Sequence, residues 1–128
     1  MMRKLFKTAV VGAGLAAVTF ALATPASANS FSQNVGDGVI SYDDASDTFC
    51  AKAYDSDGAR LVEVHLVPLS RSGPDPWWTD RNNYFGAPGP WCKSLSSAYE
   101  DTYYRAEVRT YWGERDTWVT RGPYYFYS

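Results

Sequence analysis

The chain has 128 residues, of which 16% are aromatic, 14 are acidic and 12 are basic. Residues 29–128 hold all 14 acidic side chains but only nine basic ones, and the resulting net charge of −5 argues against nucleic acid or an anionic membrane as a partner. Two cysteines and one histidine are too few for a zinc site, so we expect neither a metal nor a cofactor.

The first 28 residues have the pattern of a signal peptide. Three basic residues precede an uncharged run over residues 9–23, and Pro25 is followed by the small residues Ala26–Ala28. The run is short for a membrane span, and the small residues suit a signal peptidase. We therefore expect cleavage after Ala28, secretion, and no membrane association of the mature chain. A retained N-terminal anchor is the alternative.

The mature chain is expected to form one domain with one disulfide. About 100 residues suffice for a single small core, which we place at residues 39–128 behind a flexible N-terminal arm at residues 29–38. Cys50 and Cys92 should pair in an oxidising compartment. In the chain-entropy model, the closed loop of about 43 residues stabilises the fold by roughly 4 kcal/mol.

Two short strands are predicted at the start of the domain, over residues 39–42 and Thr48–Tyr54, with an Asp- and Ser-rich turn between them. Lys52 is expected to face solvent, because lysine is rarely buried. Side chains alternate in direction along a strand, so Cys50 shares the outer face with Lys52. The disulfide should therefore clip Cys92 across the outer face of this strand rather than cross the core.

A third strand is predicted over residues 59–69, after a hairpin signal at Asp55–Gly58. His65, the only histidine, is expected to be a surface residue, because no Ser or Cys nucleophile lies in a recognisable setting. Pro68 indicates the end of an edge strand, where a missing N–H donor costs little. The side chains assigned to the core are Val62, Val64 and Leu66.

A long connection over residues 70–91 is rich in proline, glycine and aromatic residues, with a short strand expected at Trp77–Asp80. Long ordered loops are often functional, and flat amphipathic rings can stack on sugars or anchor a protein interface. The alternative is that these rings cap a small core. The candidate binding residues are Trp77, Trp78, Tyr84, Phe85 and Trp91.

The clearest structural signal is the strand Tyr103–Trp112, in which apolar and charged residues alternate. Before it, Ser97–Glu100 fits a capping box and predicts a short helical turn. After it, residues 113–116 predict a turn, residues 117–121 return as the hairpin partner, and residues 124–127 complete the sheet. The face assigned to the core carries Tyr104, Ala106, Val108, Thr110 and Trp112.

The stretch Leu95–Thr110, with a leucine and a turn before Tyr104-x-Ala106-x-Val108-x-Thr110, resembles the strand-entry corner of fibronectin type III and immunoglobulin-like sandwiches. The resemblance covers under a fifth of the mature chain and implies a sandwich fold without any site residues. The leader, the single disulfide and the abundant tyrosine are similar to those of small secreted β proteins of high-GC Gram-positive bacteria. That similarity implies an extracellular address and no particular activity.

Together these signals predict an all-β fold, a small antiparallel sandwich or barrel of six to eight short strands with one disulfide. We expect a monomeric, non-catalytic extracellular protein that binds another protein or a glycan, or acts as an inhibitor, through its aromatic loop. One alternative is a small secreted hydrolase, such as a glycosidase, using His65 with acidic partners or the carboxylates of Glu63 and Glu107. The other is a structural protein of the cell surface.

Overall fold

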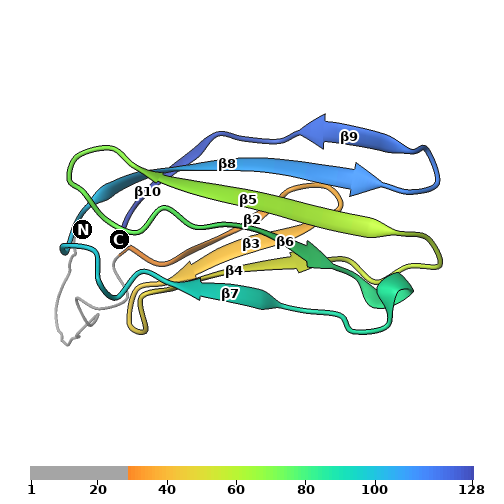
Figure 1. The fold of residues 1–128 in the computed structure, drawn as a ribbon, viewed down its shortest axis with the longest axis horizontal. Helices are drawn as coiled ribbons and strands as arrows, with labels where there is room; N and C mark the ends of the chain where they lie inside the picture. Colours follow the sequence, from red (N-terminus) through yellow and green to blue (C-terminus); the bar gives the residue numbers. More distant parts are fainter. Residues whose placement is uncertain (1–28) are drawn as a thin grey trace, which may run out of the picture.

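The computed structural model describes residues 29–128, and the predicted signal peptide and its cleavage site after Ala28 lie outside the described residues. Within residues 29–128, nine strands form two antiparallel sheets in two layers (Figure 1). None of the helical structure in this range has the length and hydrophobicity of a membrane span. The predicted all-β sandwich with one disulfide is confirmed, with one strand more than the upper limit expected.

The five-stranded sheet has the order β10-β8-β5-β6, with β9 also paired to β8. Its members are β5 (Arg60–Pro68), β6 (Trp77–Arg81), β8 (Tyr103–Trp112), β9 (Thr117–Thr120) and β10 (Tyr124–Tyr127). The four-stranded sheet has the order β2-β3-β4-β7. Its members are β2 (Phe31–Asn34), β3 (Gly38–Asp43), β4 (Thr48–Ala53) and β7 (Trp91–Ser94). One 3₁₀ turn, η3 (Asn83–Phe85), joins β6 to β7.

Strand β8 is the central strand of the larger sheet, and its predicted bounds are confirmed. It pairs with β5 along nine residues, and β9 and β10 share its other edge. Its core-facing side chains are buried as the alternation predicts, except that Trp112 is only half-buried at the strand end. Three of the other four strands of this sheet therefore pair directly with β8.

The core between the sheets is formed by alternate side chains of both layers. Aromatic rings meet at its centre, where Phe126 lies 5.0 Å from Tyr42, 5.2 Å from Phe49 and 5.5 Å from Tyr104, measured between ring centroids. The larger sheet contributes aliphatic side chains from the predicted faces of β5 and β8, namely Val62, Val64, Leu66, Ala106 and Val108. The other buried aliphatic side chains are Val35, Ile40, Ala51, Ala53 and Leu95.

The predicted flexible arm at residues 29–38 is wrong, because Phe31–Asn34 forms strand β2 and pairs with β3. The strand lacks an apolar alternation because it lies at a sheet edge with mostly exposed side chains. Within the strand only Phe31 packs against the core, 5.5 Å from Phe126 between ring centroids, and Val35 just after the strand is buried in the core. Backbone pairing, which leaves little trace in side-chain patterns, holds this segment in place.

The predicted hairpin at Asp55–Gly58 is also wrong, because β4 and β5 belong to different sheets. The local turn chemistry is present, with Ser56 Oγ donating to the carbonyl of Gly58 (2.7 Å). The turn nevertheless carries the chain from one layer to the other, where β5 pairs with β8. A local turn signal does not specify which sheet the next strand joins.

Two smaller predictions are corrected as well. Strand β5 is an interior strand, not an edge strand, because it lies between β8 and β6. Strand β6 pairs only with Leu61–His65, so Pro68 has no partner on that side and its missing N–H breaks no pairing with β6. The residues Ser97–Glu100 form turns rather than a helical segment. A hydrogen bond from the Ala98 N–H to the Leu95 carbonyl (2.9 Å) closes one turn, and so short a segment is unfavourable as a helix nucleus.

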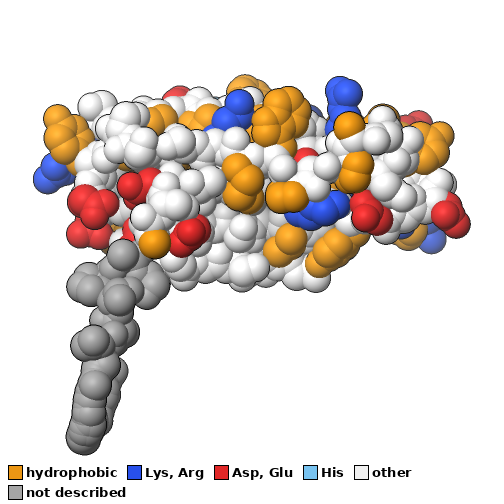
Figure 2. Space-filling view, turned by 90° about the horizontal axis from the view of Figure 1, so that it is seen from below, with side chains coloured by type: hydrophobic (Ala, Val, Ile, Leu, Met, Phe, Trp, Pro, Cys, Tyr) orange, Lys and Arg blue, Asp and Glu red, His pale blue; other side chains and the backbone are white. Residues whose placement is uncertain are grey.

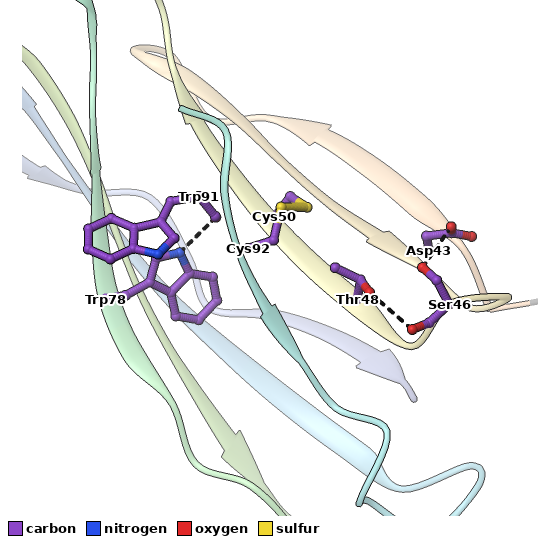
Figure 3. Close-up of a disulfide and its surroundings, with 7 residues drawn as sticks. All are labelled: Asp43, Ser46, Thr48, Cys50, Trp78, Trp91 and Cys92. Carbon is purple, nitrogen blue, oxygen red and sulfur yellow. Dashed lines mark hydrogen bonds between the residues drawn. A yellow bond between two sulfur atoms is a disulfide. The ribbon is translucent and has the colours of Figure 1, made fainter. Parts of the chain in front are cut away.

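The disulfide joins neighbouring strands of the smaller sheet (Figure 3). Cys50 on β4 lies directly opposite Cys92 on β7, with 4.0 Å between their Cα atoms. Both side chains are half-buried, while Phe49 and Ala51 beside Cys50 are fully buried. The predicted location on the outer face of this strand is confirmed.

A buried carboxylate ties the two sheets together at one end. Asp37, in the turn between β2 and β3, accepts hydrogen bonds from Arg60 Nη1 (2.8 Å) and Arg121 Nη2 (3.0 Å). It also accepts one from Thr110 Oγ1 (2.7 Å), so the turn contacts three segments of the larger sheet. Burial raises the pKa of Asp37, but these hydrogen bonds and the charge of Arg121 outweigh it and lower the pKa below its usual value.

The substitution Asp37→Asn should destabilise the fold by on the order of 2 kcal/mol at pH 7, because two guanidinium groups lose their carboxylate. The folded-state pKa of Asp37 lies below its unfolded value, so its contribution is complete above the unfolded pKa and is lost as pH falls through the folded pKa. Urea unfolding should therefore show a wild-type advantage that shrinks in acid. Equal stabilities at pH 7 would contradict this role.

Candidate functional site

Four of the five aromatic side chains proposed from the sequence are exposed. Trp77 is 65% exposed and Trp91 53%, whereas Trp78 is only 5% exposed, so its assignment to a binding surface is wrong. Trp77 pairs with His65 of β5, and this register turns Trp77 outward and its neighbour inward. The remaining two exposed rings are Tyr84 and Phe85.

Trp78 is a core residue that also holds the backbone of the loop. Its ring packs edge-on against Phe49 in the core, with 5.9 Å between centroids. Its Nε1–H donates to the carbonyl of Trp91 (3.0 Å), as Figure 3 shows. The next residue, Cys92, is held by the disulfide. The backbone that carries the exposed Trp91 ring is therefore fixed from two sides.

The start of the loop is anchored by Asn82, which is fully buried. Its amide nitrogen donates to the carbonyls of Tyr54 (3.0 Å) and Gly58 (2.9 Å). Its Oδ1 accepts from the N–H groups of Arg60 (3.1 Å) and Tyr84 (3.3 Å). One side chain thus connects the β4–β5 crossing to η3.

The exposed rings are distributed over different surfaces. The face in Figure 2, turned 90° from Figure 1, shows hydrophobic side chains in several groups separated by charged and polar ones. Phe85 and Trp91 line the same hollow of about 380 Å³ between β6 and β7, together with Arg81 and the proline- and glycine-containing residues 87–90. We call this the side hollow.

Asp80 also lines the side hollow and is buried. Its Oδ2 accepts a hydrogen bond from the N–H of Ala53 (2.8 Å), which lies beyond Ala51, the last β4 residue paired with β7. Burial raises the pKa of Asp80, and the hydrogen bond from Ala53 and the charge of Lys52 offset this only in part. A Cβ on Gly89 would clash with the carboxylate, so the loop can approach Asp80 only with glycine there.

Trp77 belongs to a different surface, the outer face of the five-stranded sheet. Its ring stacks on the imidazole of His65, with 4.5 Å between centroids and 10° between planes. His65 Nε2 lies 2.6 Å from Asp75 Oδ1, and its Nδ1 lies 3.3 Å from Glu107 Oε1. A second hollow, of about 310 Å³, lies here, and we call it the face hollow.

The two carboxylates of the hydrolase alternative, Glu63 and Glu107, both line the face hollow. Glu63 is paired with Arg109 (2.7 Å) and Glu107 with Arg105 (3.0 Å). Each of the two carboxylates therefore already has a guanidinium partner on the sheet face.

Sequence reasoning missed the polar residues that shape these surfaces. Asp80 and Asn82 are buried, although aspartate and asparagine next to a loop are usually solvated. No sequence pattern identifies Asp75, because its contact with His65 comes from the path of the connection before β6. The alternation within Trp77–Arg81 could have indicated Asp80, because it shares the inward face with Trp78.

Within the described residues 29–128, no group of three or more histidine, cysteine or acidic side chains has the geometry to hold a metal ion. Comparisons with protein families, with curated proteins and with solved structures find no match for this chain. Its function is therefore inferred from the geometry of its own side chains.

Asp80→Asn should stabilise the protein at pH 7. The folded-state pKa of Asp80 lies above its unfolded value, so its contribution is present below the unfolded pKa and is lost as pH rises through the folded pKa. An amide of the same shape can still accept from Ala53 and carries no charge to desolvate. We expect thermal unfolding of the variant to shift upward by a few degrees at pH 7 and little at pH 3. A lower midpoint at pH 7 would contradict this account.

Proposed function

We propose that the chain is a non-catalytic extracellular binding protein, inhibitor-like in its mode of action, that docks on a partner protein through the loop of residues 82–91. The observation that carries this proposal is the exposure of Tyr84, Phe85 and Trp91 on a loop whose backbone is anchored at both ends. Large exposed rings on a fixed backbone favour an interaction surface, because burying them on a partner releases much ordered water.

The composition of the loop supports a protein partner. Trp, Tyr and Arg are the residue types enriched at energetically dominant positions of protein interfaces. The guanidinium of Arg81 lies 5.6 Å from the centre of the Phe85 ring, and the ammonium of Lys93 lies 5.6 Å from that of Trp91. These cations can make polar contacts around a central aromatic anchor.

The anchoring of the loop lowers the entropic cost of binding. Asn82, Trp78 and the disulfide hold the loop ends, and prolines at positions 88 and 90 restrict its backbone. A loop that is already ordered in the free protein loses less conformational freedom on association. Inhibitor-like proteins need this property, since they must hold one geometry in the partner's cleft.

The disulfide and the chemistry of the side hollow support the other parts of the proposal. Stable disulfides form in oxidising compartments, which agrees with an extracellular address. The side hollow contains one carboxylate, Asp80, which accepts a hydrogen bond from Ala53, and its other lining residues include no further carboxylate, histidine or lysine. A single carboxylate that is already hydrogen-bonded to the backbone supports a binding role for this surface rather than acid–base chemistry.

An array of extracellular proteins, probed with the labelled protein, tests the proposal. We expect a bound partner whose signal falls at least tenfold for the variant Phe85→Ala/Trp91→Ala, because the two rings supply the central contact area. The control is Trp77→Ala, which removes a ring that is more exposed than either of these from a different surface and should leave the signal unchanged.

Folding of each variant is checked by thermal unfolding. Partners that bind the double variant as well as the wild type would overturn the assignment to the loop. Turnover of a substrate that requires Asp80 would overturn the non-catalytic part. Binding of a glycan in place of a protein at the same rings would support the loop as the binding surface and overturn the assignment to a protein partner.

A further inference from the structure

The residues that line the face hollow come from neighbouring strands across the five-stranded sheet. The hollow begins at Trp77 on β6, passes over His65 on β5 and Glu107 on β8, and ends at Gly122 and Pro123, where β9 gives way to β10. Three interstrand spacings, about 14 Å, separate the first strand from the last. The hollow is therefore long enough for a short chain molecule lying across the sheet.

Trp77 supplies a rigid apolar platform at one end of the face hollow. One face of its indole is stacked on His65, and the side chain as a whole is 65% exposed. The imidazole cannot rotate freely, because its two nitrogens face Asp75 and Glu107. The platform is consequently held in position before any ligand arrives, which lowers the entropic cost of binding.

The charges around the hollow are paired with one another. Glu63 is bound to Arg109, whose guanidinium also lies 4.5 Å from the centre of the Trp118 ring. Glu107 bridges Arg105 and His65. An arginine carries five N–H donors and a carboxylate accepts about four hydrogen bonds, so these pairs keep capacity for further polar contacts. The lining offers many hydrogen bonds and little net charge.

We propose that the face hollow binds a neutral carbohydrate, with one sugar ring stacked on Trp77 and hydroxyl groups bonded to Glu63, Glu107 and Arg109. A flat sugar face presents C–H groups to an aromatic ring, and its hydroxyls match mixed donors and acceptors. Paired charges disfavour a strongly charged ligand, which would find no opposite charge free to receive it. This site is separate from the loop of residues 82–91 and goes beyond the function proposed for it.

Isothermal titration with neutral oligosaccharides tests the inference, using cellohexaose, xylohexaose, mannohexaose, chitohexaose and maltohexaose as probes. We expect at least one probe to bind with a millimolar or tighter Kd, and Trp77→Ala to weaken that binding by about tenfold or more. Trp91→Ala is the matched control and should bind as the wild type does. The NMR signal of the Trp77 indole N–H should shift on titration, whereas that of Trp91 should not.

Failure of every probe to bind at millimolar concentration would overturn the inference. So would binding that Trp77→Ala leaves intact while its thermal unfolding matches the wild type. A heparin oligosaccharide is included as an anionic probe, and tighter binding of this probe would overturn the assignment to neutral ligands. None of these outcomes affects the loop proposal, which depends on Phe85 and Trp91.

Discussion

The rest of the structure depends on the hydrogen bonds that the buried carboxylate of Asp37 accepts. Hydrophobic burial drives the two sheets together but has no direction, so it cannot by itself fix how they are aligned. The bonds from Asp37 to Arg60, Thr110 and Arg121 are directional, and they connect a turn of one sheet to three segments of the other. Arg121 immediately precedes Gly122 and Pro123, which lie between β9 and β10 and line one end of the face hollow. The bond from Arg121 to Asp37 therefore helps to fix this segment.

Strand β6 separates the two candidate surfaces by the direction of its side chains. Trp78 and Asp80 point inward, where they bond to Trp91 and Ala53 of the other sheet. Trp77 points outward onto the sheet face. The inward pair therefore positions the loop beyond β6, while the outward ring belongs to the face hollow. A shift of one residue in the pairing with β5 would exchange these roles.

The two surfaces differ in chemistry, which is why different partner classes are proposed for them. On the loop, exposed rings lie beside Arg81 and Lys93, whose charges are available to a protein partner. On the sheet face, charged side chains are arranged in ion pairs around one ring, which suits hydroxyl groups. Both surfaces rest on a rigid two-layer fold, so both are formed before a ligand binds. A small, disulfide-linked domain thus keeps the entropic cost of ordering a binding site low.

The sequence by itself determined the class of fold, the bounds of β8 and the outward direction of Cys50, because period-2 alternation is a local property of a strand. It nominated exposed aromatic side chains but could not separate Trp77 from Trp78, since their directions depend on the register in which β6 pairs with β5, where Trp77 lies opposite His65 and Trp78 opposite Val64. Only the tertiary structure decided that residues 55–58 cross between sheets and that residues 31–34 pair at an edge. The crossing depends on the pairing of β5 with β8, which is distant in sequence, whereas the edge pairing of β2 with β3 depends on backbone hydrogen bonds that leave no apolar alternation in the side chains.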